Sequence, residues 1–191
     1  LNMIKETSGD SYEAARSLNQ QLTFEKATAL FDKRKTEFGK LQMRTLHLIG
    51  EDGMYTNLAF LLSDQCTHMI KLAIFEGSRK TVFKDRRELS GSLLEQLEEA
   101  FDYIDRYNRT RAEFSGLDRV DIRDYPPEAV REALLNAIVH RDYSFSGPTL
   151  ISIFDDRIEF VTIGGLVKGI TLEDVKLGVS VLRNQRLANV F

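Results

Sequence analysis

The sequence is poor in cysteine and has no long apolar run. Cys66 is the one cysteine in 191 residues, which excludes an intrachain disulfide framework and fits a reducing compartment. The longest apolar run is much shorter than a bilayer-spanning helix requires, so we expect no membrane span. The opening LNMIKETSGD lacks the charged-then-apolar order of a signal peptide. These absences predict a cytoplasmic protein.

The sequence also lacks several motifs that carry known chemistry. No G-x-x-x-x-G-K-[ST] occurs, which argues against a P-loop helicase motor. The net charge of -3 excludes a generally basic nucleic-acid-binding module. Neither His47 nor His68 has a second ligand at metal spacing, and a single cysteine cannot build a structural zinc site. No histidine is placed to activate Cys66, so we expect this cysteine to be buried and inert.

Hydrophobic periodicity predicts helices and strands that alternate without a strict βαβ order. The sequence therefore favours an α+β fold, a mixed sheet with helices on one face. We predict helices over 23–38 (with Thr23 as N-cap), 39–53, 91–108 and 126–142, and a short helix after an N-cap at Thr171. We predict a strand within 68–77, a short strand or turn over 80–89 and an extended segment over 111–125. Leu150–Phe154 and Ile158–Val161 should form a hairpin.

One face of the predicted helix REALLNAIVHRDY combines three chemically useful side chains. Glu132, Asn136 and His140 recur one turn apart, beside an apolar stripe that faces the core. An amide oxygen can ligate Mg²⁺, and a carboxylate can orient or deprotonate a water molecule. Spacing alone leaves two interpretations open: a nucleotide-binding face, or a half-exposed polar flank beside a buried stripe.

A glycine turn follows the hairpin that comes after this helix. In VTIGGLVKG, Gly164 and Gly165 permit positive φ and a close approach of the backbone to a ligand. The order of Glu-x-x-x-Asn helix, hairpin and glycine turn resembles the ATP-binding fold of the GHKL superfamily (gyrase, Hsp90, histidine kinases, MutL). This resemblance implies a GHKL (Bergerat)-like two-layer sandwich.

A closer resemblance covers roughly residues 20–191. YPPEAVREALLNAIVHRDYS, DDRIEFVTIGGL and RNQRLANVF resemble the divergent GHKL-type domain of bacterial proteins described as transcriptional regulators or as C-terminal regions of RecG-type ATP-dependent DNA helicases. Such proteins carry a Schlafen/AlbA-like domain upstream and a winged helix downstream, so DNA would be bound by neighbouring domains. We expect residues 1–23 to be a connector and 24–191 the domain, with an N-terminal part (24–110) and a nucleotide-site part (111–191) that stops before the second glycine box.

The resemblance also implies roles for individual residues, with ATP and Mg²⁺ as cofactors. Glu132 matches the catalytic base, Asn136 the Mg²⁺ ligand, and His140 and Arg141 a signature near the phosphates. Thr162, Gly164 and Gly165 match the adenine-reading motif. Thr162 departs from the pattern, because it offers no carboxylate to the adenine amino group. Losing that charge-assisted bond would weaken ATP binding by roughly 1.5–3 kcal/mol, so ATP hydrolysis is in question.

The most basic stretch, RKTVFKDRR, allows two interpretations. It is either a solvated hairpin or a surface that contacts nucleic-acid phosphates in a salt-sensitive manner. The residues concerned are Arg79, Lys80, Lys84, Arg86 and Arg87.

Taken together, the sequence leaves three candidate functions. The first is a nucleotide-controlled ATP-binding domain of a DNA-associated regulator. The second is a non-catalytic scaffold that forms homo-oligomers around a degenerate site, and the third is part of a helicase-like protein.

Overall fold

The computed structural model describes residues 12–115, 118–167, 169–179 and 181–191, and it confirms the α+β class. The elements, in chain order, are the 3₁₀ helix η1 (Tyr12–Ala14), α2 (Glu25–Lys33), α3 (Lys40–Thr45), α4 (Asn57–Leu62), β1 (Ile70–Phe75), β2 (Phe83–Leu89), α5 (Leu93–Tyr107), β3 (Thr110–Ser115), β4 (Asp118–Arg123), α6 (Pro127–Val139), β5 (Thr149–Ile153), β6 (Ile158–Val161), α7 (Leu172–Lys176) and α8 (Gln185–Ala188).

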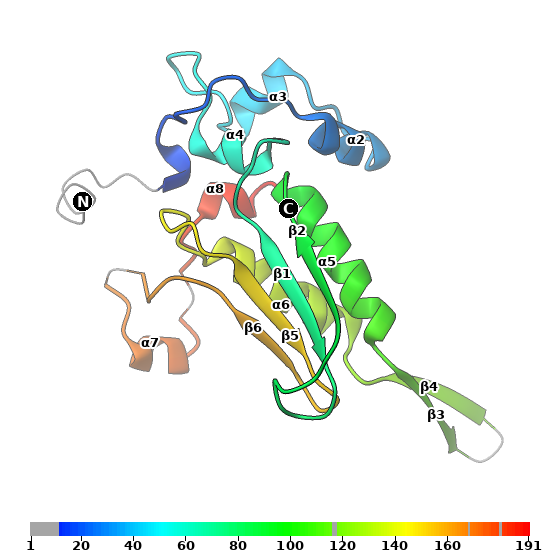
Figure 1. The fold of residues 1–191 in the computed structure, drawn as a ribbon. Helices are drawn as coiled ribbons and strands as arrows, with labels where there is room; N and C mark the ends of the chain where they lie inside the picture. Colours follow the sequence, from blue (N-terminus) through cyan, green and yellow to red (C-terminus); the bar gives the residue numbers. More distant parts are fainter. Residues whose placement is uncertain (1–11, 116–117, 168, 180) are drawn as a thin grey trace.

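A four-stranded mixed sheet in the order β2-β1-β5-β6 forms the centre of the fold. The central pair β1–β5 is parallel, and the two outer pairs are antiparallel. A parallel pair needs a long crossover, and here the chain between β1 and β5 includes both α5 and α6. These two helices cover one face of the sheet, as predicted, and give the two-layer arrangement (Figure 1).

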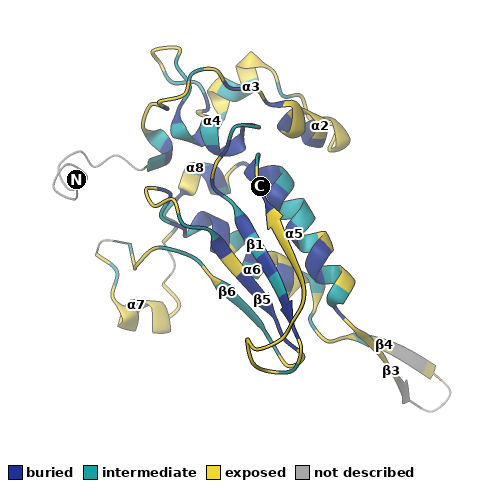
Figure 2. Cartoon of the chain, in the orientation of Figure 1, coloured by how far each residue is buried: buried dark blue, intermediate teal, exposed yellow. Residues whose placement is uncertain are grey.

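The core lies between this sheet and the two helices. Ile70, Leu72 and Ile74 alternate along β1 and are buried, as period-two patterning requires. Leu72 is in register with Ile151 of β5, and Ile74 with Ile153, so the apolar rows of both strands share one face. Figure 2 shows this buried layer, with the edge strand β2 largely exposed beside it. The α6 face that carries the candidate residues is thereby fixed relative to β5 and β6.

The segment predicted as extended over 111–125 forms the hairpin β3–β4, which projects from the connection between α5 and α6 (Figure 1). Its base is held by a reciprocal pair of hydrogen bonds. Asn108 Nδ2 donates to the carbonyl of Tyr125 at 2.7 Å, and the backbone N–H of Tyr125 donates to Asn108 Oδ1 at 3.0 Å. An ion pair between Arg123 and Asp105 adds a second link to α5.

The predicted helix over 23–38 is shorter in the structure, and its expected cap is wrong. The helix α2 spans Glu25–Lys33, and Thr23 is not its N-cap. The orphan N–H groups of Glu25 and Lys26 instead donate to the Asp64 carboxylate at 2.9 and 3.2 Å. The hydroxyl of Thr23 donates to the same carboxylate at 2.7 Å. A residue some forty positions away in the sequence therefore caps this helix.

The predicted helix over 39–53 is also shorter. The helix α3 ends at Thr45, and His47 then adopts a positive φ of 60°. A non-glycine residue in this left-handed region turns the chain and cannot continue a helix. His47 therefore lies in a turn and not on a helix face.

Residues 12–23, expected to form part of a connector, pack against the domain. Glu13 is 2% exposed, and its two carboxylate oxygens accept from the backbone N–H groups of Arg186 and Leu187 at 2.9 and 2.8 Å. The N-terminal segment thus supplies an acidic group to the first turn of α8, where such a group is favourable. No helix in the described part of the chain is long and apolar enough to cross a membrane.

Candidate functional site

The helix α6 presents the predicted polar face to solvent. Pro127 occupies its first turn, where the missing N–H costs nothing. Its apolar stripe, including Leu134 and Ile138, is buried, whereas Glu132 and Asn136 are exposed. Asn136 Nδ2 donates to Glu132 Oε1 at 3.1 Å, as side chains one turn apart on a helix can. The carboxylate and the amide thus form one unit.

An open pocket of about 470 Å³ lies between the end of α6 and the chain after β6. The polar side chains that line it are those of Asn136 and His140, from the end of α6, and of Thr162, the residue after β6. The remaining lining is glycine and apolar side chains: Gly164, Gly165, Leu166, Val167, Ile170, Val175, Gly178, Val179 and Val181. Five of the seven predicted site residues therefore meet at one cavity. Glu132 lies one turn before Asn136 and does not line it.

The helix α6 ends at Val139, three residues earlier than predicted, so both His140 and Arg141 lie beyond its last turn. His140 is the C-cap and faces the pocket. Its pKa is lowered, first by burial and then by the positive charge of Arg183. The imidazole is therefore held in its neutral form at neutral pH, in which one ring nitrogen donates and the other accepts.

Arg141 lies in the interior and does not line the pocket. Its side chain is among the largest fully buried ones, with 2% of the residue exposed. Nη1 donates to the Thr149 hydroxyl at 3.0 Å. Nη2 donates to the carbonyls of Phe145 (at 3.3 Å) and Gly147, and it lies 3.4 Å from His68 Nδ1. The guanidinium is therefore enclosed by protein groups and has no face on the pocket.

The glycine turn approaches the end of α6 closely. Gly164 has a φ of +142°, and a Cβ at this position would lie 3.2 Å from the Asp142 nitrogen and 3.3 Å from the His140 carbonyl oxygen. The N–H of Asp142 donates to the carbonyl of Ile163 at 2.7 Å and joins the two segments. Gly164 thus satisfies a backbone requirement, whereas Gly165 meets nothing within 4 Å.

Two residues that the sequence interpretation did not single out hold this geometry. Arg183 Nη2 donates to the carbonyl of Gly165 at 2.8 Å, and Nη1 lies 3.5 Å from the Asp142 carboxylate. Asn184 is buried, and its Nδ2 donates to the carbonyls of Val139 and Arg141 at 2.9 and 2.8 Å. It satisfies carbonyls that the end of α6 leaves free. Both residues belong to RNQRLANVF, one of the segments that carried the family resemblance.

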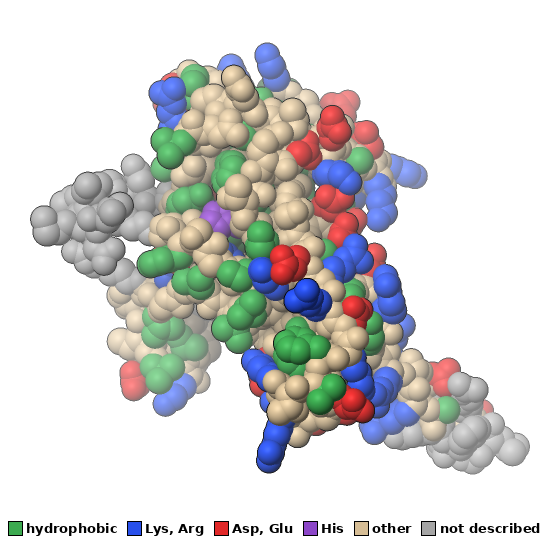
Figure 3. Space-filling view, in the orientation of Figure 1, with side chains coloured by type: hydrophobic (Ala, Val, Ile, Leu, Met, Phe, Trp, Pro, Cys, Tyr) green, Lys and Arg blue, Asp and Glu red, His purple; other side chains and the backbone are tan. Residues whose placement is uncertain are grey.

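The helix α7 and its flanking residues form the outer wall of the pocket. Thr171 is its N-cap, as predicted: the N–H of Asp174 donates to the Thr171 hydroxyl at 3.2 Å, and the Asp174 carboxylate accepts from the Thr171 N–H at 2.8 Å. Several apolar side chains here face solvent, with Leu172 55% and Leu177 83% exposed. Figure 3 shows hydrophobic side chains gathered in this part of the surface.

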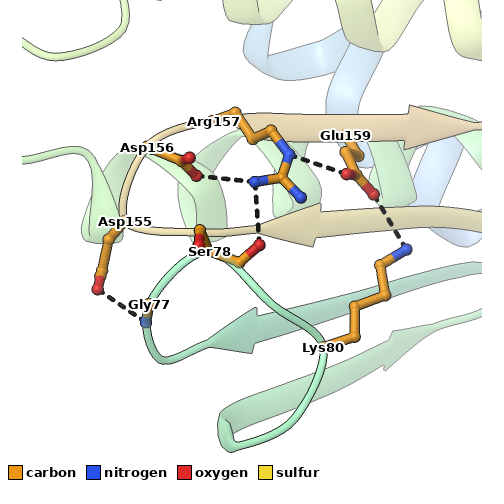
Figure 4. Close-up of polar contacts among 7 residues, drawn as sticks. All are labelled: Gly77, Ser78, Lys80, Asp155, Asp156, Arg157 and Glu159. Atoms are coloured by element: carbon orange, nitrogen blue, oxygen red, sulfur yellow. Dashed lines mark hydrogen bonds and ion pairs between the residues drawn. The ribbon is translucent and has the colours of Figure 1, made fainter.

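Three of the predicted nucleic-acid contacts are joined to acidic residues. Lys80 pairs with Glu159 at 3.0 Å, Lys84 lies 3.8 Å from Asp155, and Arg87 pairs with Glu99 at 3.0 Å. Arg79 and Arg86 are exposed, and neither has an acidic partner within 4 Å among the described residues. Figure 4 shows how the β1–β2 and β5–β6 turns are joined here.

The donor set of the pocket fits Mg²⁺ only together with an anionic ligand. Within the part of the chain that the structure describes, no group of three or more His, Cys, Asp or Glu could hold a metal ion. The amide oxygen of Asn136 is a hard ligand of the type that Mg²⁺ accepts, and phosphate oxygens and water usually supply the other ligands of this ion. Asn136 alone would therefore hold Mg²⁺ through a nucleotide.

Comparison with known proteins finds a family similarity in the C-terminal part of the chain. Residues 147–191 match the family described as "Putative ATP-dependent DNA helicase recG C-terminal", an ATPase-type domain family, which confirms the predicted resemblance there. The matched segment begins after α6 and includes Thr162 and all three pocket glycines. No curated protein matches.

A solved structure shares the fold of the chain. The DIP2311 protein from Corynebacterium diphtheriae superposes with a TM-score of 0.82 at 24% sequence identity. The alignment covers 99% of this chain and 40% of that protein, so the chain spans less than half the length of its structural neighbour. At this identity the likeness establishes the fold alone.

Proposed function

We propose that the pocket binds a magnesium–nucleoside triphosphate, because residues 147–191 match an ATPase-type domain family. The observation that carries this proposal is the cavity of about 470 Å³ in which Asn136, His140 and Thr162 meet the glycine turn. Its volume lies in the range of small-molecule sites, and its lining of apolar groups with a few convergent polar ones is typical of them.

Each polar residue has a proposed role in this site. Asn136 ligates Mg²⁺ through its amide oxygen, while its Nδ2 keeps the hydrogen bond to Glu132. Glu132 orients or deprotonates the attacking water if the nucleotide is hydrolysed. His140 contacts the phosphates as a neutral imidazole, and Gly165 provides backbone for close approach. The apolar side chains Leu166 and Val179 exclude water from the base.

The cellular role proposed for the chain is that of a nucleotide-controlled domain in a DNA-associated regulator. The helicase wording of the matched family supports an association with DNA. Contact with DNA is proposed for neighbouring domains, with residues 24–191 as the nucleotide-binding unit. Arg79 and Arg86 are the candidates for a direct phosphate contact.

A second candidate function is a scaffold that dimerises around a degenerate site. The observation in its favour is the exposed apolar surface of the α7 segment, which includes Leu172 and Leu177. Exposed apolar patches of this kind mark interaction surfaces. Thr162, which offers no carboxylate to an adenine amino group, fits this candidate as well.

The decisive test is calorimetric titration of Mg·ATP into the protein and into its Asn136→Ala variant. We expect the wild type to bind and the variant to lose at least tenfold in affinity, because the metal loses its protein ligand. Glu132→Gln is the matched control: it keeps the side-chain volume, so binding should persist while any hydrolysis falls. Absence of heat from folded wild-type protein would reject the nucleotide site and favour the scaffold.

A further inference from the structure

Residues 12–17, here called the strap, are attached to the start of α8 by a single carboxylate. Glu13 is 2% exposed, and its two oxygens accept from the N–H groups of Arg186 and Leu187 at 2.9 and 2.8 Å. In the part of the chain that the structure describes, no other donor reaches this carboxylate. The helix η1, drawn in blue, accordingly lies beside α8 in Figure 1. A buried charge is stable only when it is hydrogen-bonded, so the strap and α8 hold each other in place.

The start of α8 in turn supports the end of α6. Asn184 comes directly before α8 and is 1% exposed. Its side-chain amide donates to the carbonyls of Val139 and Arg141, which lie on either side of His140. The Val139 carbonyl belongs to the last turn of α6 and has no partner within the helix. The position of this turn, and with it the position of His140 on the pocket wall, therefore depends on Asn184.

A second route leads from the strap to the same turn of α6. The ring of Tyr12 stacks on that of Tyr143, with 6.1 Å between the centroids and 29° between the planes. The Tyr143 hydroxyl donates to the carbonyl of Ile138 at 3.0 Å. Tyr143 is 2% exposed, and a close-packed interior transmits a displacement of one ring to the next. Both routes thus end at carbonyls in and just after the last turn of α6.

This turn of α6 is joined to the other wall of the pocket, the glycine turn. The N–H of Asp142 donates to the carbonyl of Ile163 at 2.7 Å. Arg183 donates to the Gly165 carbonyl and contacts Asp142. Because Arg183 directly precedes Asn184, the short segment before α8 contacts both walls of the pocket. The separation of the two walls therefore depends on where α8 is held.

The remaining attachments of the strap do not lead to the pocket. The N–H of Ser17 donates to the Tyr55 carbonyl at 2.8 Å, and Gln20 Nε2 donates to the same carbonyl at 3.0 Å. Asn57 Nδ2 donates to the Tyr12 carbonyl at 3.0 Å. These bonds connect the strap to the start of α4, and none of these residues lines the pocket. They can persist when the side chains that reach towards α8 and α6 leave their partners.

We infer that the strap is a conformational device that sets the separation of the two pocket walls. With the strap attached, α8 holds the end of α6 against the glycine turn. With the Glu13 and Tyr12 side chains released, α8 shifts and the two walls move apart. Such a release is a local opening, which costs less free energy than unfolding the core. The device acts on the geometry of the pocket, whichever ligand the pocket takes.

The test is amide hydrogen exchange, measured by NMR, in the wild type, Glu13→Gln and Gln20→Ala. Glu13→Gln keeps the side-chain volume but replaces one acceptor oxygen by an NH₂ donor. The exchange of the Arg186 and Leu187 N–H groups should therefore rise about tenfold or more. The N–H of Asp142, which bridges the pocket walls, should also exchange about tenfold faster. Gln20→Ala removes a contact that does not lead to the pocket and should leave the Asp142 exchange within about twofold of the wild type.

The N–H groups of the central strand β1 report global unfolding and serve as the reference. A rise at Asp142 that exceeds any rise in β1 supports the strap. Equal rises throughout would mean that Glu13→Gln only lowers global stability, and they would overturn the inference. Unchanged exchange at Asp142 after Arg186 and Leu187 have lost protection would overturn it as well. Tyr12→Leu tests the second route with the same readout, and it decides the matter should Glu13→Gln fail to fold.

Discussion

The two ends of the β5–β6 hairpin use charge in opposite ways. At the turn end, Arg157 contacts Asp156 and Glu159, both at 2.9 Å, and Lys80 shares Glu159 (Figure 4). At the pocket end, the buried cation Arg141 is held by carbonyls, a hydroxyl and an imidazole. Exposed ion pairs contribute little stability, whereas a buried cation is costly to leave unpaired. The pocket end is therefore where a change of one side chain has the larger consequences.

The largest difference should appear when each end loses its central arginine. Arg141→Met leaves the Gly147 carbonyl and the Thr149 hydroxyl without their buried partner, and it should lower the free energy of unfolding by about 3–5 kcal/mol. The matched change Arg157→Met removes exposed ion pairs and a stacking contact with Phe154, and should cost about 1 kcal/mol. Urea denaturation of both variants measures the contrast. Equal losses would contradict it.

The two ends should also respond to acid in separate pH windows. Burial, reinforced by Arg141, lowers the pKa of His68 from 6.5 to about 4. Between these values the unfolded chain takes up a proton that the folded protein does not, so the free energy of unfolding falls as the pH falls. The slope is at most about 1.4 kcal/mol per pH unit. The hydrogen bonds to Lys80 and Arg157 hold the pKa of Glu159 below 4.5, so the turn end begins to lose its ion pairs only near the lower limit of this window or below it.

Urea denaturation at a series of pH values between 6.5 and 4 measures this effect. His68→Gln should show a distinctly flatter dependence, with a remainder from His140, whose pKa is also lowered. An unchanged slope in His68→Gln would show that His68 is not the group responsible.

The smallest of the three effects concerns adjacent glycines of the pocket turn. Gly164→Ala imposes a side chain at φ +142° and brings its Cβ to 3.2 Å from the Asp142 nitrogen, so we expect a loss of about 1–3 kcal/mol. Gly165→Ala meets open space at an ordinary φ and should stay within about 0.5 kcal/mol of the wild type. Thermal unfolding of the pair provides the comparison. A larger loss of stability in Gly165→Ala than in Gly164→Ala would show that the backbone constraint does not lie at Gly164.

The sequence predicted those features that depend on neighbours along the chain. The helix with Glu132 and Asn136 on one face, the β5–β6 hairpin and the Thr171 cap follow from periodicity and local hydrogen bonding, and the structure contains all three. The convergence of Asn136 with Thr162 at one cavity was implied by the family resemblance and could not be reached from spacing, because it depends on how β6 passes the end of α6.

The features that were missed depend on partners distant in the sequence. The Asp64 carboxylate that caps α2 comes from beyond α4, and no local pattern marks it. The family resemblance implied that Arg141 would lie with His140 near the phosphates. The helix ends at Val139, and the two side chains that follow point to different environments: His140 lines the pocket and Arg141 is buried. The interpretation of the basic stretch RKTVFKDRR considered only its own cations. Acidic partners such as Glu159 lie far along the chain, so the sequence near the stretch does not reveal them.

The contact between Glu13 and the start of α8 has a consequence for synthesis. A ribosome releases residue 13 long before residues 186 and 187, which supply the N–H groups that its carboxylate accepts. The N-terminal segment therefore cannot reach its final position until nearly the whole domain has been translated. Contacts of such long sequence separation slow the last step of folding. The same contact would transmit tension applied to the chain just before residue 12 to α8. From there it would reach Asn184, which precedes α8 and donates to the Val139 carbonyl at the end of α6.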